Sequence, residues 1–243
     1  MAAWSAAIEG APNQYSRPMA EVSFELDHVF VCAGPGGAEA AQLEALGLTR
    51  GPSGVHPGQG TANRCFVFHN AYLELIWVHD EADARSSLTS RTRLFERWRG
   101  RADGTCPFGI CLRPIGPSGA STPPFAGWDY LPQYVDPSRP IHVGANSDRL
   151  DEPMLFFIAT ASRPDGWPGR TPLRHRLGLR ELTGLRWARP DDSSVSRELQ
   201  AVVRAGCLGL ASGRAHALEL CFDNEEASKS ASLLPHLPVS LCW

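Results

Sequence analysis

The stretch NRCFVFHNAYLELIWV, residues 63–78, decides the fold. Residues 64–68 and 72–78 are largely apolar and of strand length, and the short segment between them, His69-Asn70-Ala71, suits a tight turn. Aromatic and branched residues favour strands, so the stretch predicts a β-hairpin. Its second strand carries a single acid, Glu74, among apolar neighbours.

Further elements are predicted on both sides of this hairpin. Residues 24–31 alternate as a strand does, with His28 expected on the face of Phe24, Leu26 and Phe30. Residues 38–46 predict a helix that ends at Gly47, and 51–62 predict a loop or a short strand with turns. Residues 86–99 have the pattern of one amphipathic helix, and 108–113 and 154–160 predict strands.

The last third of the chain repeats this order. A strand is predicted at 182–188, then a helix from 195 to 204 capped by 191–193, then strands at 207–211 and 217–222. Residues 26–29 align with 182–185, and 72–75 align with 217–220. This order predicts an internal duplication, in which Glu219 is the counterpart of Glu74.

Composition narrows the possible partners and location. The net charge of -3 argues against binding to nucleic acid, and no run of 18 apolar residues is present to span a membrane. The first residues lack the basic region of a secretory signal, and none of the seven cysteines forms a CxxC pair. Together these features predict reduced thiols and a cytoplasmic location.

Glu74 and His28 are the candidate functional residues. An ionised carboxylate on an apolar strand must be exposed, paired with an arginine, neutral or bound to a metal. A histidine on an apolar face is either a hydrogen-bonded core residue or a ligand. If the two side chains face one hollow, they form the start of a divalent metal site, with Glu219 as a third ligand.

Three stretches carry a family resemblance: LDHV at 26–29, HPGQGTAN at 56–63 and the hairpin. They resemble the glyoxalase-like family of the vicinal oxygen chelate superfamily. The resemblance implies an α+β fold, in which paired βαβββ modules form curved mixed sheets around a central cavity. The implied boundaries are a flexible tail at 1–22, a first module with an appended helix at 23–113, an irregular Pro/Gly-rich crossing segment at 114–152, a second module at 153–226 and a C-terminal tail at 227–243.

The resemblance also implies a site. A divalent metal (Zn, Ni, Mn or Fe) would be held by His28, Glu74 and Glu219. Gly184 stands where a fourth ligand is expected, so His175 is the candidate substitute. His56, His142 and His216 are further candidates, with His216 ranked last. The substrate would contact His56, Asn63, Tyr72 and Trp128, with His56 and Asn63 alternatively serving only to hold the backbone of their loop.

The function expected from these features is that of a metal-assisted lyase or isomerase, with Glu74 or Glu219 moving a proton next to a carbonyl group. An extradiol oxygenase would need two histidines and a carboxylate around iron, which Gly184 disfavours. A non-catalytic protein that binds or sequesters a small drug-like molecule is the other alternative. The expected partner is a small molecule, with a homodimer also possible.

Overall fold

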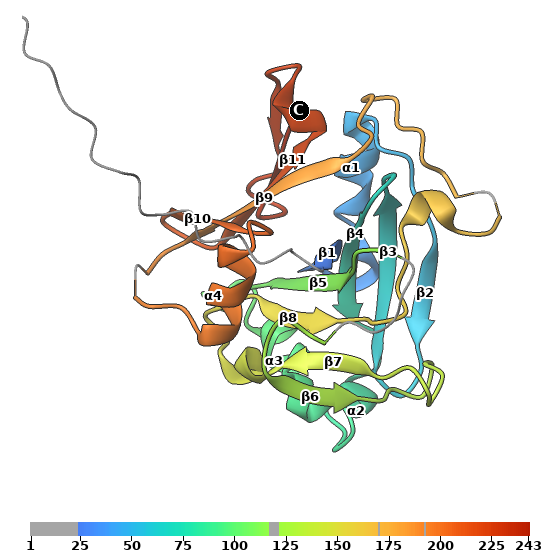
Figure 1. Ribbon diagram of the computed structural model, residues 1–243, viewed down its shortest axis with the longest axis vertical. Coiled ribbons are helices and arrows are strands. Elements are labelled where there is room, and N and C mark those ends of the chain that lie inside the picture. The colour runs from blue at the N-terminus through green and yellow to red at the C-terminus, as the bar shows by residue number, and fades with distance from the viewer. Residues whose placement is uncertain (1–23, 117–121, 170, 192) are drawn as a thin grey trace, which may run out of the picture.

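The chain folds into two β-sheets, with short helices in the connections between strands of each sheet (Figure 1). This computed structural model describes residues 24–116, 122–169, 171–191 and 193–243. Eight strands form the first sheet in the order β2-β3-β4-β1-β5-β8-β7-β6, and five form the second in the order β10-β9-β11-β13-β12. Both sheets mix parallel and antiparallel pairs, so the predicted α+β class is confirmed.

The first half of the eight-stranded sheet is a βαβββ module. It comprises β1 (Phe24–Cys32), η1 (Pro35–Gly37), α1 (Ala40–Leu46), β2 (Ser53–His56), β3 (Thr61–Val67) and β4 (Tyr72–Val78). The predicted hairpin is the antiparallel pair β3–β4. Helix α1 ends at Gly47, which has a φ of 111° that a residue with a side chain rarely adopts. The connection through α1, β2 and β3 returns the chain so that β4 pairs in parallel with β1.

The second half of the same sheet comes from residues that directly follow the first module. It contains β5 (Phe108–Pro114), β6 (Gly127–Tyr130), β7 (Ile141–Gly144), η3 (Ala145–Asp148) and β8 (Met154–Phe157). β5 pairs antiparallel with β1 and parallel with β8, so the order of strands repeats that of the first module. The chain thus divides differently from the predicted boundaries, because the segment expected to be irregular, 114–152, supplies β6 and β7.

The C-terminal third forms the other sheet and is not the partner module that the sequence analysis predicts. It contains β9 (Leu182–Arg189), α4 (Arg197–Arg204), β10 (Gly209–Ser212), β11 (Ala217–Phe222), η5 (Asp223–Glu225), β12 (Ser230–Ser232) and β13 (Val239–Cys242). Its last two strands occupy the predicted C-terminal tail. Ser196, rather than residues 191–193, caps α4 by accepting a hydrogen bond from the amide of Leu199.

The predicted helix at 86–99 is broken into η2 (Ser90–Thr92) and α3 (Leu94–Arg99), and a separate short helix, α2 (Glu81–Ala84), precedes it. The break falls at Arg93, whose φ of 58° lies in the left-handed region, so the helical path cannot continue through it. A last short turn, η4 (Pro164–Gly166), follows β8. The predicted tail at 1–22 lies outside the described residues.

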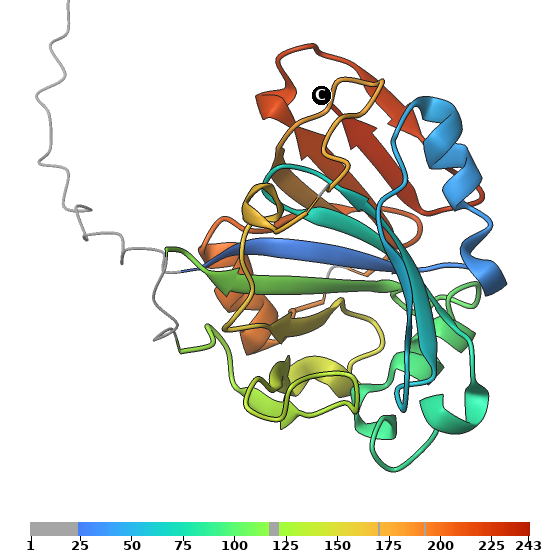
Figure 2. The same cartoon turned by 90° about the vertical axis from the view of Figure 1, so that its right-hand side faces the viewer.

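The main core lies between the two sheets. One face of the first sheet contributes Val29, Leu73 and Ile110, and the second sheet contributes Trp187 and Leu220, all fully buried. The red C-terminal strands gather at one end of the molecule, and β6 and β7 lie at the other (Figures 1 and 2). The opposite face of the first sheet is therefore left to form a separate apolar layer, which includes Phe30, Val143 and Phe156.

Within the described part of the chain, no helix combines the length and the apolar character needed to cross a membrane.

Candidate active site

A cavity of about 380 Å³ opens on the face of the first sheet that points away from the second. Both modules line it: β1, β3 and β4 provide a largely polar wall, and β7 and β8 provide an apolar one. The polar lining residues are His28, His56, Gln59, Asn63, Tyr72, Glu74, Tyr130, Tyr134, Asp136, Arg139 and Thr160. The apolar lining includes Phe30, Ile76, Val143, Met154, Phe156 and Ile158.

A β-bulge at Asp27 sets the position of His28. Leu26 pairs with Leu112 and His28 with Cys111, so Asp27 is an extra residue in β1. As a result, Leu26 packs in the core between the sheets while His28 and Phe30 line the cavity. The prediction that Leu26 and His28 lie on one face of the strand is wrong, because the bulge interrupts the alternation of side chains.

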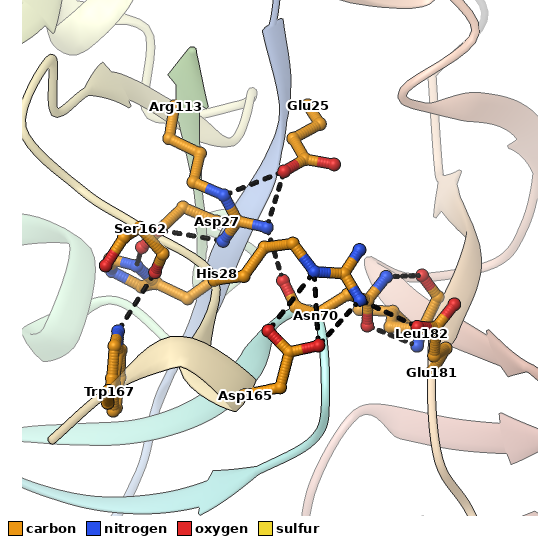
Figure 3. A network of polar contacts seen from close by, with 11 residues as sticks. Glu25, Asp27, His28, Asn70, Arg113, Ser162, Asp165, Trp167, Glu181 and Leu182 are labelled. Carbon is orange, nitrogen blue, oxygen red and sulfur yellow. Dashed lines mark hydrogen bonds and ion pairs between the residues drawn. The ribbon is translucent and has the colours of Figure 1, made fainter. Parts of the chain in front are cut away.

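The bulge also fixes the proton on the ring of His28. Asp27 Oδ1 lies 2.6 Å from His28 Nδ1, and since a carboxylate only accepts, Nδ1 carries the hydrogen. Arg113 donates to Asp27 Oδ2 at 3.0 Å and to Glu25 at 2.8 Å. Figure 3 shows Arg113 between the two acids, with His28 beside Asp27. The network leaves Nε2 of His28 facing the cavity.

Glu74 faces the same point from β4. Its Oε2 lies 3.7 Å from Nε2 of His28, and both residues are nearly buried, at 6% and 4% exposure. Asn63 Nδ2 donates to the other carboxylate oxygen at 2.6 Å. The ring of Tyr72 stacks on that of His28 with centroids 4.2 Å apart. The structure therefore brings together an imidazole, a carboxylate and their supports from three strands.

His56 extends this cluster toward the cavity mouth. Its Nε2 lies 3.3 Å from Asn63 Nδ2 and its Nδ1 lies 2.8 Å from Thr61 Oγ1, so Nδ1 donates and Nε2 accepts. Tyr134 stacks on its ring at 4.8 Å and donates to Gln59. Burial lowers the pKa of His56, while the carboxylate of Glu74 opposes this shift. The ring thus favours its neutral form.

Three predicted site residues lie elsewhere. Glu219 is on β11 of the second sheet, where it forms an ion pair with Arg186 at 2.5 Å. His175 receives a hydrogen bond from the amide of Thr49 on Nδ1 and has Val67 O 2.9 Å from Nε2, so both its nitrogens are occupied. Trp128 packs beside Tyr130 and under Arg91, next to the cavity rather than among its lining residues.

Two of the further histidine candidates are also outside this cavity. His142 faces Asp129 at 3.0 Å and lines a smaller neighbouring hollow of about 140 Å³. His216 stacks on Trp187 of the second sheet. They were further candidates for the fourth ligand, which was expected on the wrong part of the chain because the second module was assigned to residues 153–226.

The same error hid several lining residues. Strands β6, β7 and β8, which form the apolar wall, lie in or just after a Pro/Gly-rich segment that has no regular spacing of apolar residues. The sequence pattern therefore did not predict the residues of this wall. Asp27 was missed because a regular strand turns neighbours to opposite faces. A signal for it was present, since Asp27 directly precedes His28 and an acid is a common orienting partner of a histidine.

A four-ligand metal centre does not fit these residues. The first module offers His28 and Glu74. In the second module, the position equivalent to His28 is Cys111, which pairs with His28 across β1 and β5. The position equivalent to Glu74 is Ile158, two residues after Phe156, the β8 partner of Cys111. Burial raises the pKa of the Cys111 thiol well above its ordinary value, so it stays protonated, and Ile158 has no donor atom.

Asp27, His28 and Cys111 do offer donor atoms within 4.8 Å of one another. However, Asp27 already uses one carboxylate oxygen for His28 and the other for Arg113. This group is therefore a hydrogen-bond network around a histidine. Acid–base chemistry is what the arrangement can perform.

Comparison with known proteins agrees with the fold of this region. Residues 26–118 match the family model described as a glyoxalase-like domain. This region is therefore similar to a glyoxalase-like domain, consistent with the vicinal oxygen chelate superfamily, and the resemblance stated from the sequence is confirmed.

No curated protein matches the chain. A solved structure of a hypothetical protein from Staphylococcus aureus covers 90% of this chain and 98% of its own, with 10% sequence identity and a TM-score of 0.48.

Proposed function

We propose that the chain is a small-molecule enzyme of the lyase or isomerase type, in which Glu74 and His28 move a proton next to a carbonyl group. The single observation that carries this proposal is the 3.7 Å approach of Glu74 Oε2 to His28 Nε2, with Nδ1 held by Asp27. A cavity of about 380 Å³ is of the size that takes small ligands.

Charge balance supports a proton held by this pair. Arg113 carries one positive charge and pairs with two carboxylates, those of Asp27 and Glu25, so it leaves one negative charge over. Among the described residues, His28 is the one basic side chain within 4.0 Å of Glu74. A buried carboxylate requires a nearby positive charge or a proton. In the proposal, the proton that His28 and Glu74 share meets that requirement.

In the proposed step, the Glu74 carboxylate accepts a proton from the carbon next to the substrate carbonyl. The electron pair of that C–H bond forms a C=C bond, and the carbonyl oxygen receives the Nε2 proton of His28. The neutral imidazole keeps its Nδ1 proton on Asp27. An isomerisation is completed when a proton returns to the former carbonyl carbon. A lyase reaction is completed when a leaving group departs from the carbon next to the new C=C bond.

Proton exchange in deuterium oxide tests this step without knowledge of the natural substrate. A panel of small 2-oxo and 2-hydroxy carbonyl compounds is incubated with the protein, and NMR follows loss of the hydrogen next to the carbonyl. We expect the wild type to accelerate exchange for some members. Glu74→Gln and His28→Gln should each slow it by about 100-fold or more.

Glu219→Gln is the matched control, because it removes the same group from a strand of the other sheet. Its exchange rate should equal that of the wild type. Full exchange in Glu74→Gln, or equal losses in Glu74→Gln and Glu219→Gln, contradicts the proposal.

A non-catalytic binding protein is the second candidate. The apolar wall favours it: Val143, Met154 and Phe156 face the polar groups across the cavity. Thermal-shift measurements with the same panel separate the two functions. Stabilisation by compounds that show no exchange, retained in Glu74→Gln, would favour binding alone.

A further inference from the structure

Two cysteines lie side by side in the second sheet, away from the cavity. Cys221 on β11 is directly paired with Cys242 on β13, and the two strands are parallel. Their Sγ atoms are 2.7 Å apart, and both residues are nearly buried. Both are free thiols in the structure.

This placement suits a covalent bond between the two sulfurs. Neighbouring strands lie about 4.8 Å apart. Disulfides join residues with Cα atoms about 4.4–6.8 Å apart. In the described part of the chain, this is the one pair of cysteines with sulfur atoms in hydrogen-bond contact. The backbone therefore already has the spacing that a disulfide needs.

We propose that Cys221 and Cys242 form an oxidisable pair, which a small hydroperoxide converts into a disulfide that fastens the last strand to the second sheet. The site is separate from the proposed catalytic cavity, and it does not depend on the proposed function. A small oxidant is required because both thiols are almost covered.

Arg186 makes the two sulfurs unequal. Its guanidinium donates to Cys242 Sγ at 3.5 Å and also binds Glu219 and Glu225. A neighbouring guanidinium stabilises a thiolate. Cys242 is therefore the sulfur that reacts first, and Cys221 is the one that resolves the intermediate.

The reaction balances with one hydroperoxide. The Cys242 thiolate attacks a peroxide oxygen, the O–O bond breaks, and Cys242 becomes a sulfenic acid as hydroxide or alkoxide leaves. The Cys221 sulfur then attacks the Cys242 sulfur, and the sulfenic oxygen leaves as water. Two thiols lose two electrons and two protons in total, and hydrogen peroxide is reduced to two waters.

A metal is the main competing occupant, because Glu219, Cys221 and Cys242 offer donors within 4.8 Å of one another. Arg186 disfavours metal binding, because its guanidinium already forms an ion pair with the Glu219 carboxylate. Burial also raises the pKa of both thiols, which slows metal binding and the reaction with peroxide alike, so the oxidation is tested at pH 8.5. The experiment below distinguishes zinc binding from oxidation.

The test treats the folded, full-length protein with one equivalent of hydrogen peroxide at pH 8.5, followed by alkylation of the remaining thiols. We expect the mass before alkylation to fall by about 2 Da and two of the seven thiols to be lost. Peptide mapping should find a cross-link between the peptides that contain Cys221 and Cys242. A reductant should restore both thiols.

Cys207→Ser is the matched control, because Cys207 is the one cysteine of intermediate exposure and has no sulfur partner among the described residues. It should retain the cross-link, whereas Cys221→Ser and Cys242→Ser should lose it. Arg186→Gln should slow its formation several-fold. If a serine variant fails to fold, mapping of the wild type still decides the result.

Alkylation of both cysteines after peroxide treatment overturns the proposal, as does a cross-link through another cysteine. Protection of both thiols by one equivalent of Zn²⁺, measured before any oxidant is added, would instead assign the pair to a metal. Oxidation should also raise the melting temperature by several degrees, because the bond closes a loop between β11 and β13.

Discussion

Asp27 and His28 are adjacent in the chain, yet Asp27 Oδ1 lies 2.6 Å from His28 Nδ1 in one buried network. A regular strand would turn these side chains to opposite faces of the sheet. The bulge after Leu26 changes this, because it adds one residue to β1 opposite β5. A local irregularity thus gives the histidine a fixed tautomer.

Asp27→Asn should disturb that tautomer. The amide can present its NH₂ group as well as its oxygen, so Nδ1 no longer needs to carry the proton. We expect the ¹⁵N shifts of the His28 ring, recorded at a pH where the ring is neutral, to show a mixture of tautomers. Proton exchange on the carbonyl panel should slow by about tenfold or more. Glu25→Gln is the control, since it leaves Asp27 with both partners and should preserve the wild-type ring spectrum.

Introducing two metal-binding side chains into the second module should create a metal centre. Cys111→His together with Ile158→Glu adds an imidazole and a carboxylate opposite His28 and Glu74. We expect Zn²⁺ binding, measured by calorimetry, to become at least about tenfold tighter than in the wild type. The same double substitution in a Glu74→Gln background should lose most of this gain. Tight stoichiometric binding by the unaltered protein would show that two donors suffice.

His175 should make the fold sensitive to acid. Burial lowers its pKa, and protonation of Nδ1 would remove the acceptor for the amide of Thr49. Because the folded pKa is depressed below the unfolded value of about 6.5, stability is complete above that pH and declines as pH falls through the lower folded pKa.

Urea unfolding at pH 7.5 and pH 5 measures this effect. His175→Gln should lower stability at pH 7.5 and show a smaller further loss at pH 5 than the wild type does. The exposed His236 provides the comparison, and His236→Gln should keep the wild-type difference between the two pH values. An unchanged pH dependence in His175→Gln would rule out this role.

Arg97 should contribute strongly to stability although it forms no ion pair with a carboxylate in the described ranges of the chain. It is fully buried in α3 and donates to the carbonyl oxygens of Cys106 and Glu152 at 2.5 and 2.7 Å. Arg97→Met leaves these oxygens without a donor, and we expect the free energy of unfolding to fall by about 3 kcal/mol. Arg99→Met, on the exposed side of the same helix, should change it by less than about 0.5 kcal/mol.

The parts of the fold that follow from local pattern were predictable from the sequence. The hairpin at 64–78, the strand around His28 and the helix that ends at Gly47 depend on periodicity and on glycine. The same elements carry His28, His56, Asn63, Tyr72 and Glu74, and these predicted site residues do meet in the structure.

The remaining parts depend on contacts between distant segments. β6 and β7 are four-residue strands within a Pro/Gly-rich segment, so they carry almost no periodic signal. The resemblance of residues 217–220 to 72–75 is four residues long and reflects only a common strand pattern. It led to the wrong assignment of Glu219, because strand pairing, which the sequence does not display, decides which segment completes the first sheet.

The unequal contributions of the two modules have an evolutionary consequence. The ionisable pair lies on β1 and β4, whereas Met154, Phe156 and Ile158 lie along and just beyond β8. Substitutions along that apolar edge can change which molecules fit the cavity without altering the residues that we propose to handle the proton. Descendants of this scaffold can therefore acquire new specificities through changes in one module while inheriting their chemistry intact from the other.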